Sequence, residues 1–223
     1  MQRGEYVPGQ GAPLFELRPP VITGWDWAVK RTFDILVSLL VLTALLPLWL
    51  LIALLVKVSS RGPVLYGDRR IGLGEQEFSM LKFRTMIAGA DREQRRLERA
   101  NEASGALFKI RDDPRVTPLG RVLRRLSLDE VPNLLNVVRG EMSLVGPRPL
   151  PVRDYALLEE WHRRRYLVLP GMTGLWQISR RGDLSFDDLV RLDFYYLENW
   201  SLWLDVSILF KTLPAVVTRR GAF

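Results

Sequence analysis

The chain has 223 residues, of which 32 are Lys or Arg and 25 are Asp or Glu, with one histidine and no cysteine. This length allows a membrane segment together with one soluble domain of about 150 residues. The absence of cysteine excludes a disulfide framework and thiol chemistry, and it fits a reducing compartment.

The net charge of +7 is unevenly distributed along the chain. Residues 57–125 carry sixteen basic and nine acidic side chains, whereas residues 1–56 and 126–223 are each balanced. Anionic lipid headgroups and phosphorylated substrates are the partners that such a basic belt favours. Nucleic acid is the competing interpretation. An apolar segment lies immediately before the belt, so we expect membrane lipids and no nucleic acid.

The first elements in chain order are an arm and a membrane segment. Residues 1–24 are rich in Pro and Gly and are expected to form a flexible arm. Ile35 to Val56 is a run of 22 residues without a formal charge. About 20 apolar residues match the hydrocarbon core of a bilayer. Basic residues lie on both sides of this run, whereas a simple span is expected to show an asymmetry in basic charge.

Pro47 interrupts the apolar run, and a proline inside a helix kinks or breaks it. The twelve residues from Ile35 to Leu46 form roughly 18 Å of helix, which reaches only the middle of a bilayer. A re-entrant helix that breaks near Pro47 would leave both basic flanks on one side. A kinked spanning helix is the alternative that the charges leave open. The Thr43 carbonyl that Pro47 leaves unpaired needs a partner, for which the Thr43 hydroxyl is a candidate.

After the break at Gly62-Pro63 we expect mixed short elements. The predicted elements are a strand at 64–66, a strand at 78–86, a charged helix at 89–103, two helices within 116–138, a helix around 155–165, a strand at 175–178 and an aromatic-rich amphipathic helix at 186–213. The last of these suits a membrane interface, where Trp is enriched, or a protein core; both interpretations stay open.

Two adjacent carboxylates, Asp129 and Glu130, are the strongest candidates for chemistry. Ser127 and Glu130 have the S-x-x-E spacing of a capping box, which starts a helix without any catalytic role. A helix start also favours anionic ligands. An aspartate there is able to attack a phosphoryl centre as a nucleophile, or to hold Mg²⁺ together with substrate phosphates.

An attack on a diphosphate by a carboxylate requires cations to offset charge repulsion. Arginine's planar fork suits phosphate oxygens. Lys82 and Arg84 share one face of the predicted strand at 78–86, and Arg148 lies between two prolines that stiffen its backbone. The remaining candidates are Arg124, Arg180 and Arg181. The single histidine, His162, is expected at the surface, and Gly72-x-Gly74 is too weak to indicate a nucleotide site.

With these residues in view, the chain resembles the bacterial sugar transferases, the monotopic polyprenyl-phosphate phosphoglycosyl transferases, from about residue 25 to the C-terminus. The motifs that carry the resemblance are Lys30-Arg-x-Phe-Asp34, Gly62-Pro-Val-Leu-Tyr66, Lys82-Phe-Arg-Thr-Met86, Arg115-x-Thr-x-x-Gly120, Ser127-Leu-Asp-Glu-x-Pro-x-Leu-x-Asn136, Gly140-x-Met-Ser-Leu-Val-Gly-Pro-Arg-Pro149, Pro170-Gly-x-Thr-Gly174 and Asn199-Trp-Ser-Leu202.

The resemblance implies a re-entrant membrane helix and a Mg²⁺-dependent exchange in two steps. Asp129 matches the family's nucleophile, which would attack a UDP-sugar, release UMP and hold a phosphosugar that polyprenyl phosphate then accepts. Glu130 matches the second carboxylate of the dyad. Asp129 is the expected metal-binding residue. The positions implied for phosphate or substrate binding are Lys82, Arg84, Arg124, Arg148, Arg180 and Arg181.

The sequence departs from the family pattern at three positions. Leu46 replaces the Ser that many relatives have before the proline, Arg180 replaces a frequent Gly, and Asn133 replaces a frequent Gln. The C-terminal Arg219-Arg-Gly-Ala-Phe223 and the segment Asn199-Trp-Ser-Leu-Trp203 resemble hexose-1-phosphate transferases of the galactose or glucose type.

We therefore predict an α/β fold that is mainly helical with few short strands. Its parts would be an arm at 1–24, a re-entrant helix at 25–58 and a catalytic domain at 59–223 with interfacial helices at about 186–213. The expected location is the bacterial cytoplasmic membrane, with the catalytic domain on its cytoplasmic face. A homodimer and downstream glycosyltransferases are further candidate partners. The competing hypothesis is a non-enzymatic, membrane-anchored basic scaffold.

Overall fold

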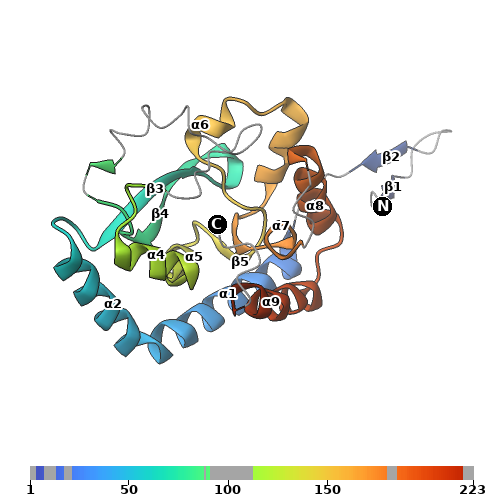
Figure 1. Cartoon of the computed structure of the whole chain (residues 1–223). Helices are drawn as coiled ribbons and strands as arrows, with labels where there is room; N and C mark the ends of the chain where they lie inside the picture. Colours follow the sequence, from blue (N-terminus) through green and yellow to red (C-terminus); the bar gives the residue numbers. More distant parts are fainter. Residues whose placement is uncertain are drawn as a thin grey trace.

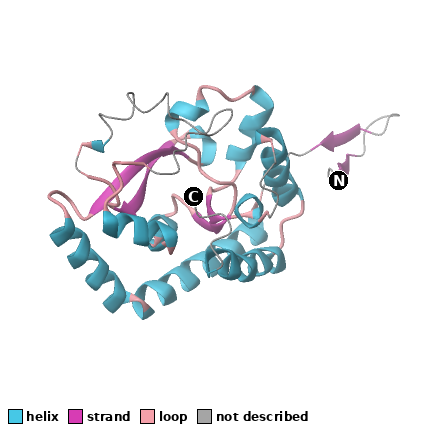
Figure 2. Cartoon of the chain, in the orientation of Figure 1, coloured by secondary structure: helices cyan, strands magenta, loops and turns pink. Residues whose placement is uncertain are grey.

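The computed structural model describes residues 4–7, 14–17, 22–87, 89–90, 113–179 and 185–217. The predicted charged helix at 89–103 lies almost entirely outside these ranges. Within them the chain is mainly helical with a few short strands, as Figure 2 shows, and this confirms the predicted fold class at that level. Strands β1 (Gly4–Val7) and β2 (Leu14–Leu17) form an antiparallel pair near the N-terminus.

Helices α1 (Gly24–Ala44) and α2 (Leu46–Ser59) form a V at the lower edge of Figure 1. They are bent by 67° at their junction, and Pro47 lies in the first turn of α2. A helix break near Pro47 is therefore confirmed. Among the described residues, no single helix is long and apolar enough to cross a membrane. The bent pair together reaches the length and composition of a membrane segment.

The carbonyl of Thr43 at the bend is satisfied by the backbone and not by a hydroxyl. A backbone amide at the helix cap donates to Thr43 O, while the Thr43 hydroxyl donates to the carbonyls of Leu39 and Leu40 at 2.8 and 3.0 Å. The hydroxyl points back along α1 because threonine in a helix reaches the carbonyls three and four residues earlier. The predicted role for the Thr43 hydroxyl is therefore wrong.

A hairpin of β3 (Leu65–Ile71) and β4 (Glu77–Phe83) follows, joined by the short 3₁₀ helix η1 (Leu73–Glu75). The strands pair in antiparallel register from Leu65 opposite Phe83 to Ile71 opposite Glu77. The strand predicted at 64–66 is thus longer than expected, and the one predicted at 78–86 begins one residue earlier and ends at Phe83.

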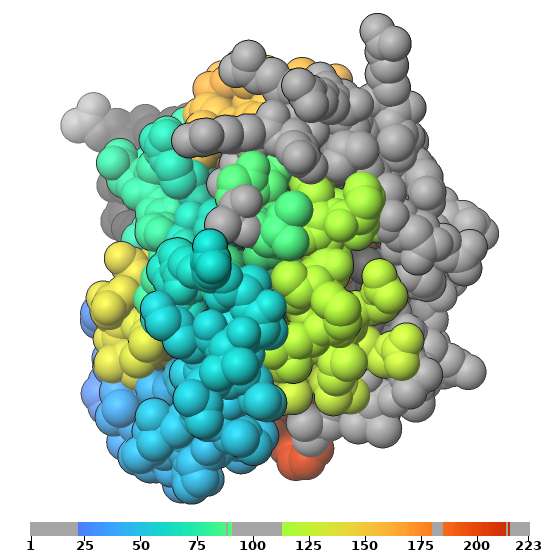
Figure 3. All heavy atoms as spheres, turned by 60° about the vertical axis from the view of Figure 1, so that its left-hand side comes forward, coloured from blue at the N-terminus to red at the C-terminus, as the bar shows by residue number. Residues whose placement is uncertain are grey.

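The central segment contains four elements: α4 (Pro118–Arg125), the 3₁₀ helix η3 (Leu128–Glu130), α5 (Asn133–Arg139) and β5 (Ser143–Val145). The two helices predicted within 116–138 are confirmed as α4 and α5. Figure 3 shows α4, in yellow-green, lying against α2, in cyan. Their contact buries Ile52 and Val56 of α2 with Leu123 of α4 and Phe83.

The C-terminal half is built from short elements that precede two longer helices. They are α6 (Val152–Tyr155), η4 (Glu160–Leu167), β6 (Gly171–Thr173), α7 (Leu175–Ile178), α8 (Phe186–Glu198) and α9 (Leu202–Val217). Strand β6 pairs in parallel with β5. The strand predicted at 175–178 is wrong, because this segment is helical and the strand precedes it. The helix expected around 155–165 is instead two short helices, the second of them 3₁₀.

The aromatic segment at 186–213 is two helices, separated at Asn199–Ser201, and its side chains divide between core and surface. Ile208 is buried, and Trp200 and Leu204 pack against the main core. Trp203 and Phe210 are 77% and 69% exposed. The core interpretation therefore holds for part of this segment, and for the exposed Trp203 and Phe210 the membrane interface stays a prediction.

His162 is buried, and the expected surface position is wrong. Its Nδ1 accepts a hydrogen bond from the backbone amide of Glu159, forming a capping box at the start of η4. Its Nε2 lies 3.1 Å from Asp187, and the ring packs edge-on against Phe186. The flanking Arg163 and Arg164 are exposed, so the basic surroundings in the sequence gave a misleading signal for this one position.

Candidate active site

Asp129 and Glu130 lie in η3, between α4 and α5. The Ser127–Glu130 capping box that the sequence suggested is not formed: Ser127 has a left-handed backbone conformation, with φ of 53°, and its side chain makes no capping hydrogen bond. The backbone turns sharply at Ser127, so the two carboxylates are presented by a tight 3₁₀ turn and not by the first turn of an α-helix.

Asn136 attaches this turn to the β3–β4 hairpin. Its side-chain oxygen accepts from the amide of Leu81 at 2.9 Å, and its side-chain nitrogen donates to the carbonyl of Ser79 at 2.7 Å. The amide group thus pairs with the edge of β4 as a neighbouring strand would. This contact holds the middle of α5 against β4, and the preceding turn places Glu130 beside Lys82.

The Thr117–Gly120 part of the sequence fixes α4 against the chain that leaves β4. Thr117 caps α4 by accepting from the amide of Gly120 at 2.9 Å, and its hydroxyl donates to the carbonyl of Thr85 at 3.2 Å. A Cβ on Gly120 would lie 2.0 Å from that same carbonyl, so only glycine allows this approach. The fit places Arg124 where its Nε donates to the Thr85 hydroxyl at 2.8 Å.

The two carboxylates have opposite electrostatic environments. Burial raises the pKa of Asp129 to about 6, and the charge of Glu130 adds to the rise. Burial would also raise the pKa of Glu130, but the charges of Lys82 and Arg148 outweigh it and lower that pKa to about 2. Lys82 Nζ is 3.2 Å from Glu130 Oε1. Near neutral pH, Glu130 is a fixed anion, whereas Asp129 is an unusually basic carboxylate.

The structure brings together three of the predicted cationic residues around this dyad. Lys82 contacts Glu130, the charges of Lys82 and Arg124 act on Asp129, and the charge of Arg148 acts on Glu130. Several cations next to two carboxylates form a site that suits an anionic substrate with two phosphates.

Arg84 does not join this group. It is buried and donates to the carbonyl and the hydroxyl of Ser60 at 2.7 and 2.9 Å, and also to the carbonyl of Pro63. These acceptors follow the end of α2, so Arg84 closes the C-terminal end of that helix. In a strand, side chains alternate between two faces, and this alternation predicted that Arg84 shares a face with Lys82. Strand β4 ends at Phe83, so the alternation does not extend to Arg84. Arg180 and Arg181 lie outside the described residues.

Arg70 is a charged residue near the dyad that the sequence analysis did not select. Its charge also lowers the pKa of Glu130, and its Nη1 donates to the carbonyl of Pro149 at 3.1 Å. The hairpin register places Tyr66 opposite Lys82, so Asp68 and Arg70 lie on the same face as Lys82. Strand alternation, once the register is known, is the signal that identifies Arg70.

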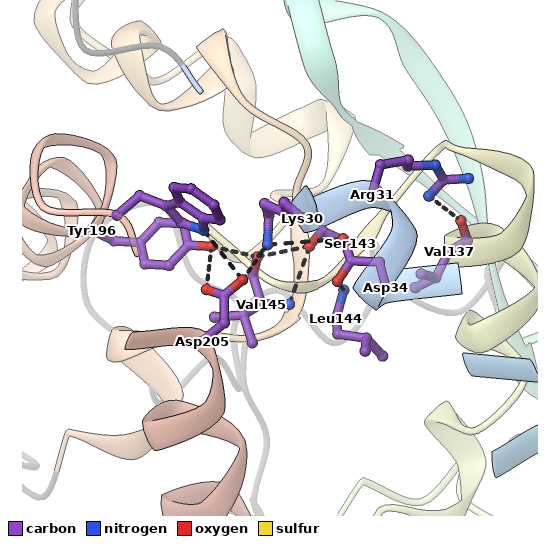
Figure 4. A network of polar contacts seen from close by, with 10 residues as sticks. Lys30, Arg31, Asp34, Val137, Ser143, Leu144, Val145, Tyr196 and Asp205 are labelled. Carbon is purple, nitrogen blue, oxygen red and sulfur yellow. Dashed lines mark hydrogen bonds and ion pairs between the residues drawn. The ribbon is translucent and has the colours of Figure 1, made fainter. Parts of the chain in front are cut away.

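A second polar network joins α1 to the segment before Arg148 (Figure 4). Lys30 is buried and donates to Asp205 at 2.7 Å and to the carbonyl of Val145 at 3.1 Å. Tyr196 donates to the same carbonyl at 2.9 Å and to Asp205 at 2.8 Å. Asp34 accepts from the amide of Leu144 at 3.3 Å. The first half of α1 is therefore a fixed part of the domain.

The protein comparisons agree with this geometry. Residues 25–219 match the family model described as bacterial sugar transferase. The chain belongs to the bacterial sugar transferase family. The predicted family is confirmed, and so is the prediction of an enzyme rather than a non-enzymatic scaffold.

Three curated relatives show the range of this similarity. The chain is 50% identical over 199 residues to the exopolysaccharide production protein ExoY of Sinorhizobium fredii, covering 87% of this chain and 88% of that protein. It is 45% identical to the undecaprenyl-phosphate glucose phosphotransferase of Komagataeibacter xylinus and 41% identical to the undecaprenyl-phosphate galactose phosphotransferase of Salmonella typhimurium. The match to the glucose phosphotransferase covers 94% of this chain and 39% of that protein, and the match to the galactose phosphotransferase covers 87% of this chain and 42% of that protein.

Proposed function

We propose that this protein transfers a hexose-1-phosphate from a UDP-sugar to undecaprenyl phosphate, giving undecaprenyl-diphosphosugar and UMP. The observation that carries the proposal is the pair of a buried Asp129 and a half-buried Glu130, with pKa values shifted in opposite directions and with Lys82, Arg124 and Arg148 acting on them, in a chain of the sugar transferase family. The names of the glucose and galactose phosphotransferases support undecaprenyl phosphate as acceptor and a hexose as the sugar.

In the first step, an oxygen of the Asp129 carboxylate forms a bond to the phosphorus that carries the sugar. The bond from that phosphorus to the bridging oxygen breaks, and UMP leaves with the electron pair. A pKa of about 6 leaves Asp129 mostly ionised at pH 7 to 8 while making it more basic than an ordinary aspartate. The nearby lysine and arginines offset the repulsion between this carboxylate and the diphosphate.

In the second step, a phosphate oxygen of undecaprenyl phosphate bonds to the phosphorus held on Asp129. The bond from phosphorus to the aspartyl oxygen breaks and regenerates the carboxylate. Glu130 stays anionic throughout because its pKa is about 2, and it holds Lys82 in place beside the reacting groups. It is thus an electrostatic partner of the cations and not a proton donor.

Mg²⁺ is part of this proposal, with Asp129 as its protein ligand. Mg²⁺ is bound through one or two carboxylates and substrate phosphates more often than by a full cage of side chains. The described residues contain no group of three or more His, Cys, Asp or Glu side chains placed for a metal ion. The Asp129 oxygens are nevertheless hard ligands beside the proposed diphosphate position. Bound there, Mg²⁺ would neutralise charge on the phosphates.

The bent α1–α2 pair supports membrane attachment through a re-entrant helix, as part of the same proposal. Its exposed side chains include Leu40, Leu50 and Leu54, each at least 60% exposed. Exposed leucines in this number favour a lipid environment over water. A polyprenyl chain stays in the bilayer because each CH₂ taken into water costs about 0.8 kcal/mol. We propose the cytoplasmic membrane surface as the place of reaction, where cytoplasmic UDP-sugar meets the acceptor.

The test is UMP release by the purified chain in vesicles or nanodiscs that contain undecaprenyl phosphate, with UDP-glucose and UDP-galactose as donors and Mg²⁺ present. We expect release with at least one donor, its loss on chelation of Mg²⁺, and a decrease of at least about 10³-fold in Asp129→Asn. The control Asp26→Asn, an exposed carboxylate on α1, should keep wild-type activity. Full activity in Asp129→Asn would remove Asp129 from the role of nucleophile.

A further inference from the structure

Four consecutive backbone carbonyls around Arg148 accept hydrogen bonds from three elements of the fold, β3, η4 and β6. Pro147 O accepts from the amide of Gly171 at 2.9 Å, and Leu150 O accepts from the amide of Ile71 at 3.1 Å. The two carbonyls between them accept from side chains: Pro149 O from Arg70 at 3.1 Å and Arg148 O from Arg165 at 2.8 Å.

The prolines on either side of Arg148 explain why the backbone here is held through its carbonyls and not through its amides. Pro147 and Pro149 have no amide hydrogen to donate, so this segment cannot be held by an ordinary strand ladder. The position of the Arg148 backbone therefore depends on what its carbonyls bind. The Arg148 side chain is partly exposed, and its charge acts on Glu130.

Arg165 is the one donor among these four that is a fully buried charge. It is 1% exposed, and the Nη2 atom that binds the Arg148 carbonyl also lies 2.7 Å from Oδ2 of Asp193 in α8. Its guanidinium carbon is 5.2 Å from the centre of the Trp176 ring. Its Nε and Nη1 atoms have no hydrogen-bond partner among the described residues. The contact through Nη2 is thus the polar role that the structure gives this side chain.

We propose that Arg165, held by Asp193, is a positioning residue that fixes Arg148 for phosphate binding. The charged pair itself is too deeply buried to touch a substrate. It acts through one carbonyl: if the Arg148 backbone moves, the Arg148 guanidinium loses its place beside Glu130 and the diphosphate. This inference rests on the proposed function, because it assigns Arg165 a part in the same site.

The test is a double-mutant cycle of wild type, Arg165→Lys, Arg148→Ala and the double variant, with kcat and KM for UMP release as readouts. Lysine keeps the charge beside Asp193, but its side chain is one atom shorter than arginine, so its ammonium does not reach the position of Nη2, from which one nitrogen contacts both Asp193 and the Arg148 carbonyl. We expect Arg165→Lys to lower kcat/KM about 10- to 100-fold in the wild-type background and less than about 2-fold in the Arg148→Ala background.

Equal effects of Arg165→Lys in both backgrounds would overturn the inference, because a general structural role does not depend on the Arg148 side chain. Asp193→Asn gives a milder second variant that keeps a hydrogen-bond acceptor, and its effect should vanish in the same background. The matched control is Arg164→Lys, an exposed neighbour on η4, which should stay within about 2-fold of wild type. Thermal melting checks that each protein is folded.

The affinity for inorganic pyrophosphate, measured by calorimetry on the same four proteins, separates this inference from the proposed function. We expect Arg165→Lys to weaken pyrophosphate binding only when Arg148 is present. If the wild type released no UMP, the proposed function would fail, and the pyrophosphate cycle would still decide the role of Arg165. Additive losses of affinity in that cycle would contradict it.

Discussion

Two regions of the molecule differ in how their residues are surrounded. The first is the outer part of the α1–α2 pair, residues 39–59, and the second is the segment Ser143–Leu150, called the fixed segment below. Apart from Ile52 and Val56, which pack against α4, the outer pair leaves most of its leucines exposed, and Leu40, Leu50 and Leu54 are at least 60% exposed. In Ser143–Leu150 all residues except Arg148 are buried, and the backbone is held by side chains from α1, α8 and η4. Helix α1 connects the two regions. Its C-terminal end is part of the outer pair, and Lys30 and Asp34 in its first half form hydrogen bonds with the fixed segment (Figure 4).

This difference shows how the proposed membrane element is joined to a rigid site. The exposed leucines would be unfavourable in water, at about 25 cal/mol per Å² of apolar surface, and need a lipid or a similar environment. The fixed segment does not need a lipid environment, because its backbone carbonyls accept hydrogen bonds from within the protein. Helix α1 carries buried polar residues at Lys30, Asp34 and Ser38 and exposed apolar residues toward its C-terminal end, so under the proposed membrane attachment it would set the position of the site relative to the bilayer.

The largest effect on stability is expected from breaking the junction of the two regions. Asp205→Ala removes the nearer carboxylate partner of the buried Lys30, at 2.7 Å, and leaves only Asp34 at 3.8 Å; loss of one member of a buried ion pair costs about 3–5 kcal/mol. The melting temperature in detergent should fall by roughly 10 °C. Asp26→Ala, which removes an exposed carboxylate from the same helix α1, should change it by no more than about 2 °C. Similar melting temperatures for the two variants would show that the Lys30 network does not hold α1.

The exposed region is tested by placing a charge on it. Leu50→Asp and Leu54→Asp should each weaken membrane partitioning by about 2.5–3.5 kcal/mol, which is on the order of 100-fold, with little change in melting temperature in detergent. The matched control is Leu157→Asp, since Leu157 is 66% exposed but lies between α6 and η4. Flotation with vesicles measures the partitioning. Equal losses in all three variants would contradict a membrane role specific to α2.

Within the site, the two carboxylates should respond to pH with opposite signs. The folded-state pKa of Asp129, about 6, lies above its unfolded value, so ionisation of Asp129 destabilises the fold above that pH. Asp129→Asn should raise the free energy of unfolding by roughly 2–3 kcal/mol at pH 8, and the gain should vanish as the pH falls to about 4.

Glu130→Gln is the comparison for this titration. The pKa of Glu130 is lowered to about 2, so its ionised form stabilises the fold above its unfolded value of about 4.5, and this stabilisation is lost as the pH falls toward 2. The Gln variant should therefore be less stable than wild type at pH 8. Denaturant unfolding at pH 4, 6 and 8 measures both variants. If both substitutions changed the free energy of unfolding in the same direction at pH 8, the electrostatic environments assigned to Asp129 and Glu130 would be wrong.

The smallest effect concerns the turn that presents the dyad. Ser127 makes no capping hydrogen bond and has a φ of 53°, so Ser127→Gly should stabilise the fold by about 0.5–1 kcal/mol. Ser185 does cap α8 through the amide of Asp188, and Ser185→Ala should cost about 1 kcal/mol. Denaturant midpoints compare the two. A loss of stability in Ser127→Gly would indicate a cap that the structure does not show.

The sequence predicted the features that depend on local chemistry. Pro47 indicated the helix break, and the adjacent carboxylates with Lys82, Arg124 and Arg148 indicated the site. It failed where tertiary contacts decide. Ser127 has the spacing of a capping box, but its backbone turns the wrong way for one. Arg84 has the composition of a phosphate ligand, but it closes the end of α2. Long-range pairings such as Arg165 with Asp193 leave no local pattern.

The central claim is that Asp129 carries the phosphosugar, and a covalent adduct tests it most directly. The purified wild-type protein is mixed with Mg²⁺ and the accepted UDP-hexose in the absence of undecaprenyl phosphate, quenched, digested and analysed by mass spectrometry. We predict a hexose-phosphate adduct on Asp129 that disappears when undecaprenyl phosphate is added before the quench. An adduct on another residue, or none while UMP is released in amounts equal to the enzyme, would contradict the account.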